Sequence, residues 1–364
     1  ISVDTLRADR LGAWGYVRRT SPRIDGFSAG AVRFAWAMTP SPSTRHALPS
    51  LFTGRYPSTI SRTAPPPSLA EVTRDAGYET AAVLCCQRLV APRELRGFSS
   101  VDTGADVVRM SRAGQANADA VADAAVAWLR RPHDRPFLLW VHFYDPHHPY
   151  ATPEGGVHFG DSDSDQYDAE IAFADRGIGR VLAAIDEAGL GSTAIVALTS
   201  DHGEELGEHG LRFHARSLYN QVTRVPLIVR SPDSRPSVVD RPVSLVDVMP
   251  TLLELAGVAA PPDLSGVSLA PVIRGTAPAP ARPVLIELVP DRQIHRDLAA
   301  IVGDGWKAIW DREANAWSLF SLADPEDRHD RAAADPATLA TWQQQLFALL
   351  DRELATTPGT AVRP

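Results

Sequence analysis

The chain lacks several features that would assign it to a specialised class of protein. It has only two cysteines in 364 residues, so a disulfide framework is excluded. No apolar run approaches the roughly 20 residues needed to cross a membrane. It also lacks an excess of basic residues, because its net charge is −8 with both signs interspersed. A nucleic-acid-binding protein would show a basic face, whereas an anionic ester could still bind through a metal ion.

The two cysteines, Cys85 and Cys86, are adjacent in a strand-like segment. Because neighbouring residues of a strand point to opposite faces, we expect them to be buried packing residues that do not bond each other. The sequence opens at Ile1, inside a strand-like run and without an initiator methionine. We therefore expect any targeting segment or membrane anchor to lie upstream.

Strand-like apolar runs alternate with amphipathic helical segments over most of the chain. The strand-like runs are 1–3, 80–85, 136–143, 192–200 and 226–231, and the helical segments are 116–131, 167–189 and 243–257. Continuous β-branched runs that alternate with helices are typical of a parallel sheet covered on both faces. The predicted fold class is therefore α/β, with a large, mostly parallel sheet sandwiched by helices.

A proline-rich segment, 275–283, is predicted to be a connection. After it come short strand-like runs at 298–304, 306–313 and 317–323 and an amphipathic helix at 337–354. We therefore expect a catalytic domain at 1–283 and a small C-terminal α+β subdomain at 284–364, formed by an antiparallel sheet plus a helix.

Polar side chains follow three of the predicted strands where each one ends. Asp4 follows 1–3, Asp201 and His202 follow 192–200, and His147 and His148 come shortly after 136–143, which itself contains His142. In open α/β sheets ligands bind outside the carboxyl ends of the strands, so we expect these side chains to meet at one sheet edge.

Asp201 and His202 are candidate metal ligands. A carboxylate and an imidazole on adjacent residues just past a strand can both turn toward one cation, and Gly203 is expected to allow a sharp turn. The alternative is that Asp201 caps the next helix and His202 is merely exposed. Since Asp4 is expected at the same edge, metal binding is the favoured interpretation.

Thr44 and His214 are candidate catalytic residues. Thr44 is predicted at the amino end of a helix over 44–51, where the helix favours negative charge and a metal would favour the alkoxide. Taken alone, the local sequence fits ordinary helix capping by Ser43 or Thr44 better. His214 precedes the strand at 226–231 and could bind substrate oxygens or protonate a leaving group; alternatively, it is a surface histidine.

Together these segments resemble the sulfatase branch of the alkaline phosphatase superfamily, in the family's order and over nearly the whole chain. The matching segments are ISVDTLRADRLGAWGY (1–16), STRHALPSLFTGRYP (43–57), HFYDPHHPY (142–150), TSDHGEELGEHG (199–210), HARSLYNQVTRVPLIV (214–229), SLVDVMPTLLELAGV (244–258) and WSLFSLADPEDRHD (317–330). The resemblance implies an alkaline-phosphatase-like fold. By position, it also implies that Asp4, Thr44, Asp201 and His202 bind the metal and that Thr44 is the nucleophile.

The resemblance further implies that His147 and His214 hold the ester oxygens and help the leaving group depart. Arg45 and His46 directly follow Thr44 and are candidates for substrate contact, although a role on the helix surface fits them equally well. The pocket is expected to be shaped by loops such as 155–165 and by the C-terminal sheet.

The sequence departs from the sulfatase pattern at the nucleophile. Sulfatases of the main type carry a Cys or Ser in CxPSR that becomes formylglycine, and a Thr side chain cannot become that aldehyde. The string SPSTR (41–45) lies three residues too early to supply the motif. His214 stands where many sulfatases have Lys, and Asp4-Thr5 where many have two Asp. Fewer oxygen ligands plus an imidazole suit zinc or manganese better than calcium.

The predicted function is metal-dependent hydrolysis of sulfate or phosphate esters, with zinc, manganese or calcium as cofactor. The substrate is expected to be a small-molecule, glycan or lipid ester, and no nucleic acid is expected as a partner. A phosphoethanolamine- or phosphoglycerol-type transferase and a non-catalytic protein of the same fold are the alternatives. Family habit, and nothing firmer, predicts an extracytoplasmic location.

Overall fold

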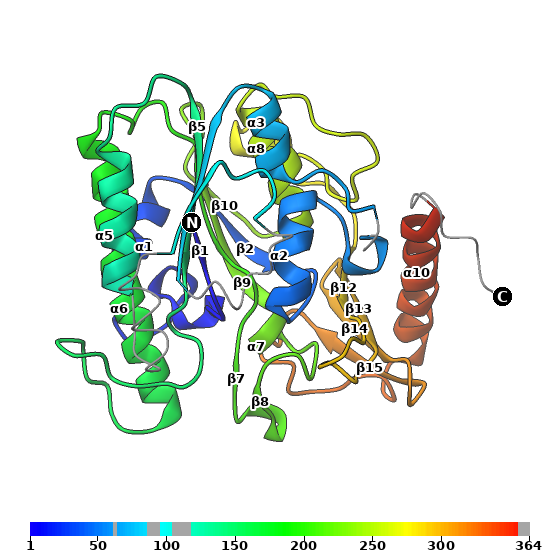
Figure 1. The fold of residues 1–364 in the computed structure, drawn as a ribbon. Helices are drawn as coiled ribbons and strands as arrows, with labels where there is room; N and C mark the ends of the chain where they lie inside the picture. The colour runs from blue at the N-terminus through cyan, green and yellow to red at the C-terminus, as the bar shows by residue number, and fades with distance from the viewer. Residues whose placement is uncertain (61–63, 86–94, 104–117, 356–364) are drawn as a thin grey trace.

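The protein consists of a large central sheet with helices on both faces and a smaller sheet beside it (Figure 1). The computed structural model describes residues 1–60, 64–85, 95–103 and 118–355. The central strands are β1 (Ser2–Val3), β2 (Val32–Met38), β3 (Glu79–Leu84), β4 (Ser100–Asp102), β5 (Phe137–Phe143), β6 (Val196–Ser200), β9 (Arg224–Arg230), β10 (Ser237–Val239) and β11 (Val243–Ser244). Their order is β10-β2-β9-β6-β1-β5-β3-β4, with β11 also paired to β2.

The central sheet is parallel except at β9, which runs antiparallel to both of its neighbours, β2 and β6. One face is covered by α1 (Pro22–Ala29), α5 (Ala118–Leu129) and α6 (Asp163–Glu187), and the other by α2 (Thr44–Thr53), α3 (Leu69–Asp75) and α8 (Val248–Leu255) (Figure 1). The predicted α/β class is therefore confirmed. Helix α6 turns Ile171, Ile178 and Val181 into the core at helical spacing, each worth about 1.5–3 kcal/mol of burial.

The smaller sheet contains β12 (Val284–Leu288), β13 (Leu298–Gly303), β14 (Trp306–Asp311) and β15 (Ala316–Ser321), all antiparallel. It begins directly after the proline-rich connection, and α10 (Pro336–Ala355) packs Trp342, Leu346 and Leu349 against it. The predicted antiparallel sheet plus helix is confirmed, while the boundary between 283 and 284 stays a prediction.

Some elements differ from the sequence prediction. The segment 243–257 was expected to be helical throughout, but it begins as β11 and becomes α8 only at Val248, because Ser244 and Asp247 form a capping box between them. Helix α6 begins at Asp163, inside the predicted loop 155–165, because Ser162 accepts the backbone N–H of Asp165. The helix predicted at 116–131 starts at Ala118 among the described residues.

The prediction for the cysteines can be followed only at Cys85. This residue is buried as expected, directly after β3 ends at Leu84, and it is disulfide-bonded. The expectation that the two cysteines do not bond each other also involves Cys86. Cys86 itself lies outside the described residues. No helix in the described part of the chain has the length and apolar character for crossing a membrane.

Candidate active site

Asp4, Asp201 and His202 meet at the carboxyl edge of the central sheet. Asp4 directly follows β1 and Asp201 directly follows β6, and these strands are neighbours. His202 Nε2 lies 3.8 Å from Asp4 Oδ1 and 3.5 Å from Asp201 Oδ2. One ligand atom from each of the three residues lies within 4.8 Å of the others, and all three side chains are fully buried. The convergence of strand ends places two carboxylates and an imidazole around one point.

The carboxylates of this group have oxygens with no partner in the protein. Both oxygens of Asp4 and Oδ2 of Asp201 are buried without a hydrogen bond. Burial, followed by the nearby charges of Asp201 and Glu204, raises the pKa of Asp4 well above its usual range. Leaving buried carboxylate oxygens unpaired is costly, and a cation at this point would pair them. The donor set therefore fits a divalent metal ion.

His202 presents a lone pair to the same point. Its Nδ1 lies 2.9 Å from the carbonyl oxygen of Gly203, to which it donates, so Nε2 is the unprotonated nitrogen. Burial and the neighbouring His214 lower the pKa of His202 well below its usual value, and the ring is neutral as a ligand must be.

Gly203 is required by close packing and not by the sharp turn that the sequence suggested. Its φ lies outside the left-handed region, but a Cβ there would stand 2.0 Å from the carbonyl oxygen of Gln221. Only glycine allows the loop with the candidate metal ligands to approach the segment around Gln221 so closely.

Thr44 is the first residue of α2 and brings its hydroxyl to the group. Thr44 Oγ1 lies 3.0 Å from His202 Nε2 and donates to it. The residue before the helix, Ser43, makes no side-chain capping bond, and Thr44 itself is half-buried at the first turn. Neither residue caps α2 through its side chain, so the hydroxyl of Thr44 faces the predicted ligands where the amino end of the helix favours negative charge.

His214 approaches from the loop between β8 (Arg212–Phe213) and α7 (Asn220–Thr223). Its Nδ1 lies 2.8 Å from Glu204 Oε1, and its ring centre lies 4.5 Å from that of His202. Phe213 and Ala215, on either side of it, both have positive φ angles, and the Ala215 N–H donates to the Pro42 carbonyl. The loop is thus held in a costly conformation that points His214 at the group, a common feature of functional sites.

Glu204 fixes the orientation of His214. The carboxylate is fully buried, accepts from Tyr150 at 2.8 Å and faces His214 Nδ1. Burial alone would raise the pKa of Glu204, but its hydrogen bond to His214 and the charge of that ring lower it, so the carboxylate is ionised. Because Glu204 occupies Nδ1, Nε2 is the nitrogen of His214 that is left for a ligand.

His147 lies next to His214, with ring centres 5.2 Å apart. Its Nδ1 donates to the carbonyl oxygen of His148 at 2.6 Å and lies 2.7 Å from the Tyr144 hydroxyl. Burial, followed by the proximity of His214, lowers the pKa of His147. All six residues predicted for the site are therefore brought together in one continuous group, although their roles stay predictions.

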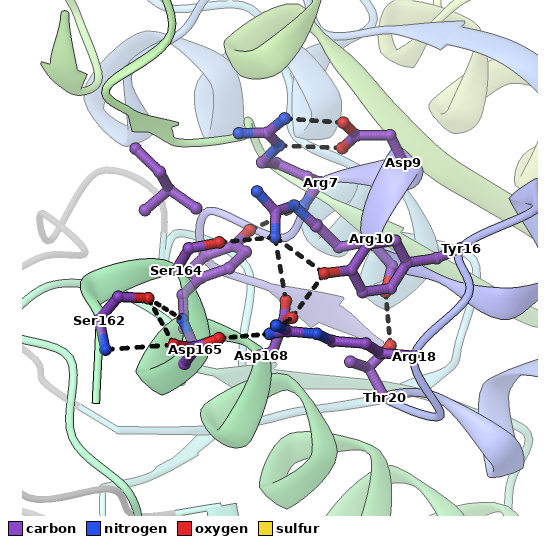
Figure 2. A network of polar contacts seen from close by, with 12 residues as sticks. Arg7, Asp9, Arg10, Tyr16, Arg18, Thr20, Ser162, Ser164, Asp165 and Asp168 are labelled. Carbon is purple, nitrogen blue, oxygen red and sulfur yellow. Dashed lines mark hydrogen bonds and ion pairs between the residues drawn. The ribbon is translucent and has the colours of Figure 1, made fainter. Parts of the chain in front are cut away.

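The loop that carries Asp4 is held by a polar network (Figure 2). Thr5 has a φ of 56°, which is unusual for a β-branched residue, and its N–H donates to Asp201 at 3.3 Å. Arg7 donates to the Glu204 carbonyl and pairs with Glu208. Farther along the same loop, three side chains converge on Asp168 of α6, namely those of Arg10, Tyr16 and Arg18 (Figure 2). The network ties the loop after β1 both to α6 and to the segment that orients His214.

Arg45 and His46, the suggested substrate contacts, face the C-terminal subdomain. Arg45 Nε donates to Asp291 at 3.1 Å and is about half exposed, while His46 Nε2 lies 3.9 Å from the same carboxylate. Asp291 lies in the loop between β12 and β13. This loop therefore forms part of the surface beside Thr44.

Sequence reasoning missed Glu204, Tyr150 and Tyr144, which position the histidines. Glu204 lies two residues after His202, and an acidic residue beside a predicted His-rich site was a usable signal. The tyrosines gave no such signal, because a tyrosine near a turn is usually a packing residue. His142 lies inside β5, where its Nδ1 bonds Ser2 Oγ at 2.8 Å.

Two protein-family models match the sequence. The family model described as Sulfatase matches residues 1–258, and the model described as N-sulphoglucosamine sulphohydrolase, C-terminal, matches residues 207–353. The chain is 27% identical to the uncharacterized sulfatase YidJ of Escherichia coli, covering 74% of this chain and 69% of that protein. It is 39% identical to mouse steryl-sulfatase over a shorter stretch, covering 43% of this chain and 27% of that protein.

Solved structures share the fold over the whole chain. A phosphonate monoester hydrolase of Agrobacterium radiobacter superposes with a TM-score of 0.81 at 19% identity, covering 100% of this chain and 99% of that one. A 2-O GAG sulfatase superposes with a TM-score of 0.80 at 20% identity, covering 100% and 93%. At these identities the likeness concerns the fold alone.

Proposed function

Because the chain belongs to the sulfatase family, a family of hydrolases that act on sulfuric esters, we propose that it cleaves its ester with Thr44 as the nucleophile. The observation that carries the proposal is the 3.0 Å approach of Thr44 Oγ1 to His202 Nε2, beside the buried pair of Asp4 and Asp201. A hydroxyl placed against a metal-type donor set is the arrangement expected for an activated alcohol nucleophile.

Asp4, Asp201 and His202 would hold the divalent cation, with the Thr44 oxygen beside it. When bound, such a cation supplies Lewis-acid stabilisation of negative charge on the ester oxygens. Three protein ligands that include an imidazole favour zinc or manganese over calcium, which prefers six to eight oxygens.

We assign the remaining catalytic roles to three side chains of the protein. Thr44 releases its hydroxyl proton to solvent, its Oγ1 attacks the sulfur or phosphorus atom in line, and the bond from that atom to the leaving oxygen breaks. His214, held at Nδ1 by Glu204, donates from Nε2 to the leaving oxygen, while His147 contacts the equatorial oxygens. Water then attacks the ester formed on Thr44 and gives a proton back to His214 Nε2, the bond to Thr44 Oγ1 breaks, and this oxygen takes up a proton from solvent to restore the hydroxyl.

Thr44 also supports a second candidate, the hydrolysis of phosphate or phosphonate esters. Threonine cannot be converted to formylglycine, so the chain has to release the group from a stable oxygen ester instead of from an aldehyde hydrate. Among sulfate substrates we propose glycan or small-molecule esters, the former because a glycan sulfatase shares the fold.

The two candidates are separated by a parallel assay after loading the protein with zinc, manganese or calcium. The substrates are p-nitrophenyl sulfate, p-nitrophenyl phosphate, an aryl phosphate diester and an aryl phosphonate monoester. The largest kcat/KM among them identifies the preferred ester, and turnover of none of them by any loaded form counts against hydrolysis.

The role of Thr44 is tested by Thr44→Ala, which is expected to fold normally and to lose turnover. The matched control is Ser50→Ala, which removes a buried hydroxyl from the same helix, one that makes no hydrogen bond. Near wild-type turnover in Thr44→Ala would remove Thr44 from the mechanism.

A further inference from the structure

A buried ion pair in the C-terminal subdomain forms hydrogen bonds to the short helix α7 of the catalytic domain. Lys307 of β14 and Asp327 are both essentially unexposed, and Lys307 Nζ lies 2.8 Å from Asp327 Oδ2. The same ammonium donates to Asn220 Oδ1 at 2.9 Å and to Thr223 Oγ1 at 3.2 Å. Asn220 and Thr223 are the first and last residues of the short helix α7, which lies outside the subdomain.

Asp327 grips the amino end of α7 as well. Its Oδ2 accepts the backbone N–H of Asn220 at 2.9 Å, and its Oδ1 accepts from the side-chain amide of Asn220 at 3.1 Å. Next to it, Gln221 Nε2 donates to the Glu326 carbonyl at 3.1 Å. The subdomain therefore holds α7 at both ends and through its backbone.

The other side of α7 contacts the loop with the candidate metal ligands. The Gly203 N–H donates to the Val222 carbonyl at 3.0 Å, and Gly203 packs directly on the Gln221 carbonyl. The Thr223 carbonyl accepts the N–H of Thr39, whose hydroxyl in turn donates to the Asp201 carbonyl at 2.5 Å. Both Asp201 and the Gly203 peptide, whose carbonyl sets the tautomer of His202, are thus located by α7.

We propose that Lys307 and Asp327 are positioning residues for the metal-binding loop 201–203 and act on it through α7. This inference rests on the proposed function of Asp201 and His202. A buried ion pair adds little stability compared with apolar residues of similar volume, so its contribution here is to fix the place of the groups it bonds. Outer-shell partners of metal ligands commonly change metal affinity 10- to 100-fold when they are mutated.

The test is calorimetric titration of Mn²⁺ into EDTA-treated full-length protein. Lys307→Met is expected to weaken Mn²⁺ binding about 10- to 100-fold. The double variant Lys307→Met/Asp327→Asn leaves no unpaired charge and keeps a residue type that tolerates the positive φ of 52° at position 327. It should recover stability relative to the single variant and still bind Mn²⁺ weakly.

The matched control is Leu346→Ala, which opens a cavity in the same subdomain on α10, in a hydrophobic cluster that contains no residue of α7. It should lose stability and bind Mn²⁺ like the wild type. Wild-type affinity in the double variant, or an equal loss of affinity in Leu346→Ala, would overturn the proposal.

Asp201→Asn, titrated in parallel, separates this inference from the proposed function. Loss of Mn²⁺ binding in Asp201→Asn together with wild-type affinity in the double Lys307/Asp327 variant refutes only the positioning role. A wild-type protein that binds no Mn²⁺, or an Asp201→Asn variant that binds it normally, refutes both proposals.

Discussion

Replacing Gly203 by alanine should damage the active site by displacing a loop, without removing any functional group. A Cβ at this position would stand 2.0 Å from the Gln221 carbonyl oxygen, and side chains practically never approach closer than 3.0 Å. The loop or α7 must therefore move by at least 1.0 Å, the difference between these two distances. Since the obstacle is a backbone atom of a helix gripped at both ends, the flexible partner is the loop that carries His202.

The size of the effect follows from this displacement. A misplacement of about 1 Å commonly costs about 100-fold in rate, which corresponds to about 2.7 kcal/mol in kcat/KM. Overpacking should also lower the free energy of unfolding by about 1–3 kcal/mol. The assay is kcat/KM with the preferred aryl ester, together with urea unfolding of the same preparation.

The matched control is Gly26→Ala in α1, where no atom lies within 4 Å of the added Cβ. That variant should keep full activity and gain about 0.5–1 kcal/mol of stability, because alanine is the better helix former. A Gly203→Ala protein with kcat/KM close to that of the wild type would refute the close-approach argument.

Two further outcomes are expected. Asp4→Asn should raise the free energy of unfolding of the metal-free protein by about 1–2 kcal/mol, because it removes a buried carboxylate that has no partner. The same variant should no longer be stabilised by added Mn²⁺. Urea unfolding in the presence of EDTA or of Mn²⁺ measures both effects. Burial, with Asp145 nearby, raises the pKa of Glu170 to about 9, so its contribution to stability is complete below pH 4.5 and is lost as pH rises toward 9. Glu170→Gln should therefore gain stability relative to the wild type between pH 5 and pH 9, and parallel curves for the two proteins would contradict this reasoning.

Part of the site could be predicted because one general rule acts on two of its residues. Asp4 and Asp201 directly follow buried parallel strands, and such strand ends meet at one edge whatever else the chain does. Thr44 was the harder case, because local sequence favoured a helix cap. Only the family-like order of the surrounding segments pointed to the contact with His202 that the structure shows.

Other parts could not be predicted because they depend on contacts across the chain. Strand β2 carries Arg33 directly after its first residue, which interrupts its apolar sequence, yet pairing with β9, β10 and β11 makes it a central strand. Lys307 occupies a position in a short strand where a lysine is normally exposed. Its burial follows from partners some 80 residues away, which no local pattern indicates.

The proposed cation site joins residues that are far apart along the polypeptide, since Thr44 and His202 are separated by 158 positions. Such a pocket has no counterpart in an unfolded or half-assembled chain, so an ion can recognise only the completed native state. Occupancy of the site by an ion would then depend on complete folding of the chain. An ion in this site would therefore bind only after the segments that carry Asp4, Thr44 and His202 have come together.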